Sequence, residues 1–113
     1  MNEAFPQAVI AGNMIFISGM AGIDVSTGRL VGTSFEEQAM QAFENIRILL
    51  EEAGSSMSKV IKTTIFMVAG NDFAIVNKVY KHYFPTEAPA RSVPQVLPFP
   101  GDILISVECI AVL

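Results

Sequence analysis

The segment from residues 103 to 112 constrains the fold of this chain more than any other. It is rich in β-branched residues and predicts a strand. Successive side chains of a strand point to opposite faces of the sheet. One face therefore carries Ile103, Ile105, Val107, Cys109 and Ala111, and the other carries Leu104, Ser106, Glu108, Ile110 and Val112. Both faces are largely apolar, so both must be covered by other parts of the protein.

Turn signals predict the elements near the start of the chain. Gly12-Asn13 separates two apolar runs, residues 7–11 and 14–18, and predicts a hairpin because both turn residues tolerate positive φ. A second turn at residues 24–28 precedes a short strand at residues 29–31. The first part of the chain is therefore expected to contain three strands.

Capping signals predict two helices. Ser34 and Glu37 match a capping box, and an apolar stripe continues from there to Gly54, which suits a left-handed C-cap. A second helix begins after Asn71 or Asp72, either of which can cap it. The apolar stripe of this helix is expected to comprise Phe73, Val76, Tyr80 and Phe84.

Further strands flank the second helix. Residues 60–68 are rich in β-branched side chains, and residues 92–97 predict another strand, which a turn at residues 98–102 joins to the strand at residues 103–112. The expected order is β-β-β-α-β-α-β-β. We expect a single α+β domain over residues 1–113, with a mixed sheet covered on one face by two helices.

The second face of that sheet predicts an oligomer. Two helices can cover only one face, so the other face must meet another subunit. The composition agrees, because 51% of the residues are hydrophobic and only 16% are charged, whereas soluble proteins average ~25% charged residues. A membrane protein is not expected, since no apolar run approaches the ~20 residues that a spanning helix needs.

The charge balance argues against a nucleic-acid partner. The formal net charge is −4, the sequence pI is about 4.8, and the basic residues form no patch. Cys109 is the single cysteine and is expected to pack in the core; with one histidine besides, neither a disulfide nor a metal site is expected. No glycine-rich nucleotide-binding pattern occurs. We therefore expect no metal or cofactor and, without a secretion signal, a cytoplasmic location.

Two charged residues are candidates for chemistry. Arg91 stands where a strand begins, and its planar guanidinium suits bidentate binding of a carboxylate, although such an arginine can equally pair with an acid at the surface. Glu108 alternates with apolar residues, where a carboxylate is costly unless it is paired or protonated. It suits a general acid or base, or a carboxylate satisfied at a subunit interface. We expect it on a strand next to that of Arg91.

Three further polar positions accompany them. Asn77 falls on the apolar stripe of the second helix, where a buried amide either orients a ligand or ties down a loop. Ser18 and Gly19 end a strand, where a glycine lets a ligand approach the backbone or forms a bulge. His82 lies close to lysines and is expected on a solvated helix face.

These features together resemble the RidA family, also called YjgF or L-PSP proteins. The resemblance covers nearly the whole chain. It is carried by Gly12-Asn13-Met14-Ile15 with Ser18-Gly19, the helix from Gln41 to Glu51-Glu52-Ala53-Gly54, Val60-Ile61-Lys62-Thr63-Thr64-Ile65-Phe66, Asn71-Asp72-Phe73-Ala74-Ile75-Val76-Asn77, Pro89-Ala90-Arg91-Ser92 and Val107-Glu108-Cys109-Ile110-Ala111-Val112. Each segment alone is weakly specific, but the set in this order is quite specific.

The resemblance implies a chorismate-mutase-like fold and a homotrimer whose pockets lie between subunits. It implies hydrolysis of enamines and imines, such as 2-aminoacrylate, 2-iminopropanoate and 2-iminobutanoate, to 2-oxo acids and ammonia without a cofactor. Arg91 would hold the substrate carboxylate, and Glu108 would orient or activate the attacking water. Asn77, Ser18 and Gly19 would line the pocket.

Two pocket positions depart from the family pattern. Val93 stands where many deaminases of the family carry cysteine, and Phe5 stands where many carry tyrosine. Pro94 is unusual inside a strand and indicates an edge or a bulge beside the site. These departures bear on the substrate more than on the fold.

Two other functions stay open beside the deaminase. One is a regulatory trimer that binds small carboxylates without turnover. The other is an endoribonuclease or translation inhibitor, an activity attached to some relatives. That activity fits poorly with a pI of about 4.8 and a single histidine on a helix.

Overall fold

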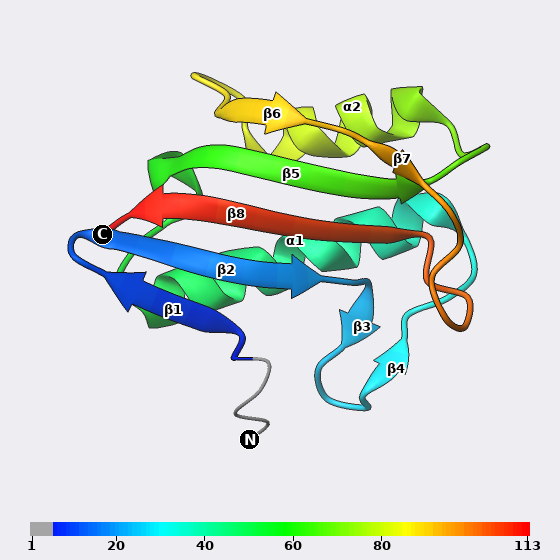
Figure 1. Ribbon diagram of the computed structural model, residues 1–113, viewed down its shortest axis with the longest axis horizontal. Coiled ribbons are helices and arrows are strands. Elements are labelled where there is room, and N and C mark those ends of the chain that lie inside the picture. Colours follow the sequence, from blue (N-terminus) through cyan, green and yellow to red (C-terminus); the bar gives the residue numbers. More distant parts are fainter. Residues whose placement is uncertain (1–5) are drawn as a thin grey trace.

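A computed structural model describes residues 6–113, in which two helices lie behind a six-stranded sheet (Figure 1). The sheet strands are β1 Ala8–Ala11, β2 Met14–Met20, β5 Val60–Val68, β6 Ala90–Ser92, β7 Gln95–Val96 and β8 Ile105–Val112. The helices are α1 Phe35–Glu52 and α2 Phe73–Tyr83, with a short 3-10 turn at Met57–Lys59. A separate two-stranded ribbon consists of β3 Ile23–Asp24 and β4 Arg29–Leu30.

The main sheet is mixed, as the sequence predicts. Its strands follow the order β1-β2-β8-β5-β6, and β7 also pairs with β5. The pairs β1–β2, β2–β8 and β8–β5 are antiparallel, whereas β6 and β7 run parallel to β5. The parallel pairing follows from the chain path, because α2 carries the chain from the end of β5 back to the start of β6.

Local signals place both helices where the sequence predicts them. In α1 the Glu37 amide donates to the Ser34 hydroxyl at 3.1 Å, and the Ser34 amide donates to the Glu37 carboxylate at 3.1 Å. Gly54 follows the helix with φ +86°, which confirms the left-handed cap. In α2 the cap is Asp72, whose carboxylate accepts a hydrogen bond from the Ala74 amide at 2.9 Å.

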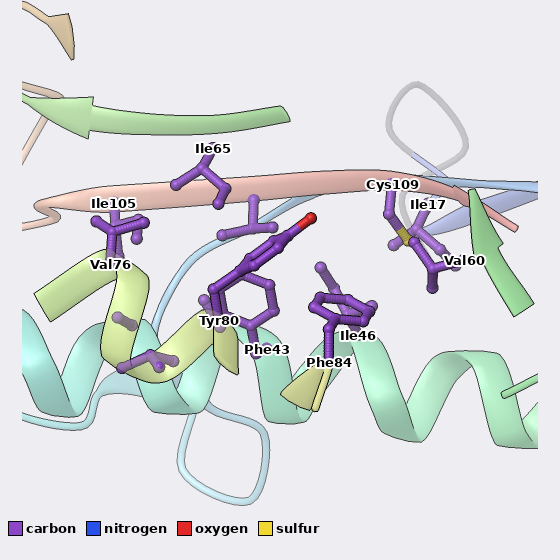
Figure 2. Packing of buried hydrophobic residues seen from close by; sticks show 14 of the residues in the cluster. Ile17, Phe43, Ile46, Val60, Ile65, Val76, Tyr80, Phe84, Ile105 and Cys109 are labelled. Atoms are coloured by element: carbon purple, nitrogen blue, oxygen red, sulfur yellow. The ribbon is translucent and has the colours of Figure 1, made fainter. Parts of the chain in front are cut away.

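The hydrophobic core lies between the helices and one face of the sheet (Figure 2). The predicted alternation in β8 is confirmed, since Ile105, Val107, Cys109 and Ala111 are all buried toward the helices. The opposite face of the sheet carries no helix in the described part of the chain (Figure 1). Apolar side chains stand open on it, among them Phe16, which is 40% exposed. The uncovered apolar face that the sequence predicts is therefore present.

The structure corrects three predicted elements. The strand expected at residues 92–97 is two short strands, β6 and β7, because Pro94 between them has no amide hydrogen to donate. The strand expected at residues 29–31 is the shorter β4 Arg29–Leu30, and it pairs in the separate ribbon with β3, a strand that the sequence did not predict. The last strand begins at Ile105, two positions after the predicted start at Ile103. None of the helices in the described part of the chain combines the length and apolar character that crossing a membrane requires.

Candidate functional site

Arg91 lies on β6, at one edge of the sheet, and its side chain turns toward α2. Thr63 is its neighbour in the β5–β6 pairing, and the Thr63 hydroxyl is hydrogen-bonded to the Tyr80 hydroxyl of α2 at 3.0 Å. Adjacent positions of paired strands point to the same face. Arg91 therefore shares the helix face of the sheet, where its guanidinium (Nη1) donates to the Asn77 side-chain oxygen at 2.9 Å.

Two aromatic rings complete the surroundings of Arg91. Its guanidinium carbon lies 4.8 Å from the centre of the Tyr80 ring and 5.6 Å from the centre of the Phe73 ring. Burial raises the pKa of the Tyr80 hydroxyl, against the opposing effects of its hydrogen bond to Thr63 and the Arg91 charge. Tyr80 is therefore a neutral ring at physiological pH, and it can attract the cation through its π face.

No acid neutralises Arg91 within residues 6–113. The ion pairs there join Arg47 to Glu44 and Glu51, and Lys78 to Glu36. The described part of the chain therefore does not support the alternative in which Arg91 is a surface arginine paired with an acid. The guanidinium keeps free N–H donors and an uncompensated positive charge, which is the chemistry of an anion receptor.

The prediction that Asn77 is buried is wrong, since Asn77 is exposed. Phe73 is 42% exposed and likewise does not belong to the core stripe. Phe73, Asn77 and Tyr80 are spaced i, i+4 and i+7, so they form one stripe along α2. That stripe faces the end of Arg91 at the edge of the sheet, while Val76 and Tyr80 continue into the core.

Glu108 lies away from Arg91. It is exposed, and β5 stands between its strand and that of Arg91, so the expected neighbouring strand is wrong. Glu108 pairs with Thr64, whereas Arg91 pairs with Thr63. Consecutive residues of β5 point to opposite faces, so Glu108 stands on the uncovered face and Arg91 on the helix face. One protomer does not bring the two side chains together.

Ser18 and Gly19 lie near the end of β2, which stands between β1 and β8, where a β-bulge interrupts the pairing of β2 with β8. The Ser18 hydroxyl donates to the Pro6 carbonyl at 2.6 Å. Both residues border a cavity of about 590 Å³ between β2, β3 and α1. Its other lining residues include Met20, Ile23, Asn45, Ile48 and Leu49. Thus the predicted residues form separate groups, with Arg91 and Asn77 at the β6 edge, Glu108 on the uncovered face of β8, and Ser18 and Gly19 at the end of β2.

Ser106 lies against Gly19 and was not among the candidate residues that the sequence predicted. A Cβ atom on Gly19 would lie 2.6 Å from the Ser106 hydroxyl oxygen, closer than real side chains allow. That hydroxyl forms no hydrogen bond to another residue within the described range. A glycine inside a strand signals the close approach of another group. The approaching residue could not be named, because it depends on the register across the bulge.

The remaining predicted positions have different outcomes. Val93 is half-buried and packs against the core, and the Pro94 carbonyl beside it accepts from the Met67 amide at 3.1 Å. Phe5 lies outside the described residues. Cys109 is buried, as predicted, and burial raises the pKa of its thiol to about 12, so it is a poor nucleophile. His82 is exposed, as predicted.

A second cavity, of about 640 Å³, opens beside the start of α1. It contains none of the predicted site residues. Tyr83 lines it and donates a hydrogen bond to the Glu44 carboxylate at 3.0 Å. Burial, and then this carboxylate, raise the pKa of Tyr83 to about 12. Within residues 6–113 no group of His, Cys, Asp or Glu side chains is placed to hold a metal ion.

Comparisons with known sequences and structures find similar proteins that match nearly the whole chain. The sequence profile of the family described as Endoribonuclease L-PSP matches residues 2–113. The chain is 41% identical over 109 residues to the 2-iminobutanoate/2-iminopropanoate deaminase of Rattus norvegicus, covering 96% of this chain and 80% of that protein. It superposes with a TM-score of 0.89 on RidA from the Antarctic bacterium Psychrobacter sp. PAMC 21119, at 36% identity over 95% of this chain and 86% of that one. E. coli TdcF with bound serine gives a TM-score of 0.87 at 36% identity, again over 95% and 86% of the two chains.

Proposed function

Since this chain belongs to the L-PSP (RidA) family, we propose that it hydrolyses reactive 2-imino and enamine acids to 2-oxo acids and ammonia. The observation on which the proposal rests is the environment of the Arg91 guanidinium. Its guanidinium is held by Asn77 and two aromatic rings, with no carboxylate beside it in the described residues. Such a cation suits the carboxylate that every 2-imino acid carries. The name of the rat relative, and the serine bound to TdcF, support a small amino-acid-like ligand.

The reaction needs only a few catalytic groups from the protein. The protonated imine carbon is electrophilic, and an enamine reaches the same species when a proton adds to its terminal carbon. Water adds to the imine carbon, the C–N bond breaks, and ammonia leaves as the C=O bond forms. Arg91 would fix the substrate carboxylate. Glu108 would take a proton from the attacking water and return it to the nitrogen, so that the nitrogen leaves as ammonia. A general base typically contributes ~10²–10⁴-fold to the rate, and orientation adds to this.

The positions of these residues support a site shared between subunits. Arg91 and Asn77 lie at the β6 edge, whereas Ser18, Gly19 and the face with Glu108 lie elsewhere on the protomer. A ring of copies joined head to tail would place the β6 edge of each copy against a different surface of the next. We propose that the ring is a homotrimer, in which Arg91 of one copy meets Glu108 and the Ser18-Gly19 end of β2 of its neighbour. The apolar uncovered face of the sheet supports this assembly.

A cytoplasmic location belongs to the same proposal. Small secreted domains commonly depend on disulfides, and this chain has a single cysteine, which is buried.

Val93 and Phe5 stand where many family deaminases carry other residues, so they would set which 2-imino acid is preferred.

The test is the decay of 2-iminobutanoate or 2-iminopropanoate, generated in situ from the amino acid by an oxidase. We expect the wild-type protein to accelerate the decay and Arg91→Ala to abolish the acceleration, with Arg91→Lys retaining a small part because it keeps the charge without the planar fork. Glu108→Gln should slow turnover ~10²-fold or more if it is the base. Lys78→Ala is the control, since Lys78 is exposed and pairs with Glu36 away from these groups.

A wild-type decay equal to that of the blank across several 2-imino acids would exclude the deaminase. Binding of 2-oxo acids that requires Arg91 would then favour the regulatory carboxylate-binding trimer. If Glu108→Gln keeps full activity, the base is another group, and Ser106→Ala is the next variant to measure because Ser106 stands against Gly19.

A further inference from the structure

Phe73 is an unusual residue for the place it occupies. It is the first residue of α2, directly after the Asp72 cap, and its large apolar side chain is 42% exposed. The neighbouring core aromatics, Tyr80 and Phe84, are each only 7% exposed. An exposed phenylalanine ring gains little free energy from burial, so burial alone does not explain a phenylalanine at this position. The contact it makes is with Arg91, whose guanidinium carbon lies 5.6 Å from the ring centre.

We propose that Phe73 is a positioning residue that, together with Asn77, holds the Arg91 guanidinium in the pose that receives a carboxylate. The proposal deepens the function given above, because the carboxylate in question is that of the substrate. It depends on three contacts from one stripe of α2, namely the Phe73 ring, the Asn77 oxygen and the Tyr80 ring. The three residues approach the same guanidinium from successive turns of the helix.

Positioning matters because an arginine side chain is long and has many rotamers. A free arginine at an exposed sheet edge would lose this freedom when it binds a ligand, and affinity would fall accordingly. The ring of Phe73 and the oxygen of Asn77 restrict the guanidinium before the ligand arrives.

Phe73 is the member of the stripe that can be tested cleanly. Tyr80 is 7% exposed and is hydrogen-bonded to Thr63 in the core, so its removal would also disturb the fold. The amide of Asn77 could contact the ligand directly, so its removal would not separate positioning from binding. Phe73 contacts Arg91 through an exposed ring, and its replacement leaves the core in place.

The experiment compares Phe73→Ala, Phe73→Leu and Phe73→Tyr with the wild type. It measures kcat and KM for 2-iminobutanoate, and the Kd of 2-oxobutanoate by calorimetry, with melting temperatures to show that each variant is folded. We expect Phe73→Ala to raise KM and Kd about three- to tenfold, with kcat changed less than about twofold, the size that a partly exposed cation–π contact supports. Phe73→Tyr keeps the ring and should match the wild type, whereas Phe73→Leu keeps apolar bulk alone and should behave like Phe73→Ala. Lys78→Ala, on the same helix, is the matched control.

The possible results separate the positioning role of Phe73 from the deaminase activity. A folded Phe73→Ala variant with wild-type KM and Kd overturns the proposal, and so does a Phe73→Tyr variant as weak as Phe73→Ala. A wild-type protein that binds no 2-oxo acid overturns it as well. A wild-type protein that binds the 2-oxo acid without turning over any imine refutes the deaminase alone, because the Kd comparison still tests Phe73.

Discussion

At the scale of single residues, Gly19 shows how closely β2 and β8 are packed at the bulge between them. An alanine there would place its Cβ 2.6 Å from the Ser106 hydroxyl. We expect Gly19→Ala to lower the free energy of unfolding by about 1–3 kcal/mol, because the clash must be relieved by moving Ser106 or the bulged strand. Urea denaturation of the purified variants measures the effect.

The double variant Gly19→Ala/Ser106→Ala is the matched control for that prediction. Removing the hydroxyl removes the clash, so the double variant should be more stable than Gly19→Ala alone. Equal instability of the two would show that the Gly19 backbone itself, and not its contact with Ser106, sets the requirement for glycine.

The residue scale also shows what sequence reasoning can find in a site. Arg91 could be singled out as a candidate only with the family resemblance, because its chemistry alone also suits a surface arginine paired with an acid. Its relation to Glu108 could not be predicted, because two strands that are close in the sequence have β5 between them in the sheet. The exposure of Asn77 was missed for a related reason. Whether a helix stripe faces the core or the sheet edge depends on where the helix crosses the sheet.

At the scale of elements, α1 depends on its capping box. Ser34→Ala removes the acceptor of the Glu37 amide, which lies at 3.1 Å. We expect a loss of about 1 kcal/mol in the free energy of unfolding, within the range of 0.5–2 kcal/mol known for such caps. Thermal and urea unfolding measure it.

Thr33→Ala provides the control for the cap. Thr33 is an exposed hydroxyl residue next to Ser34 and is not part of the capping box. Its loss should change stability by less than about 0.5 kcal/mol, as is usual for surface substitutions. A Thr33→Ala effect as large as that of Ser34→Ala would contradict the assignment of the cap.

Elements with local signals were predictable, and those that depend on distant pairing were less so. The hairpin at Gly12-Asn13, the capping box at Ser34 and the left-handed Gly54 all act through neighbouring residues, and each is present. The strand expected at residues 92–97 failed because its residues pair in parallel with β5, far away in the sequence. Pro94 correctly predicts an edge strand, but it does not indicate where that strand is interrupted.

At the scale of the whole molecule, the uncovered face of the sheet calls for an assembly. We expect light scattering at micromolar concentration to give three times the 12.2 kDa of one protomer. Phe16→Glu should dissociate the assembly, because Phe16 is 40% exposed on that face and a charge there would be buried without a partner. Thr33→Glu is the control, since Thr33 is exposed beside the start of α1 and does not lie on the sheet. A wild-type mass of one protomer would refute the trimer.

The division of the edge strand at Val93 and Pro94 has a consequence for how the chain behaves when it is crowded. A long, regular edge strand offers a row of free amide and carbonyl groups on which strands of other molecules can add, the first step toward fibrils. Here that edge is two short pieces, β6 and β7, separated by a residue with no amide hydrogen. The interruption beside the proposed ligand site therefore also protects the protein from uncontrolled strand addition.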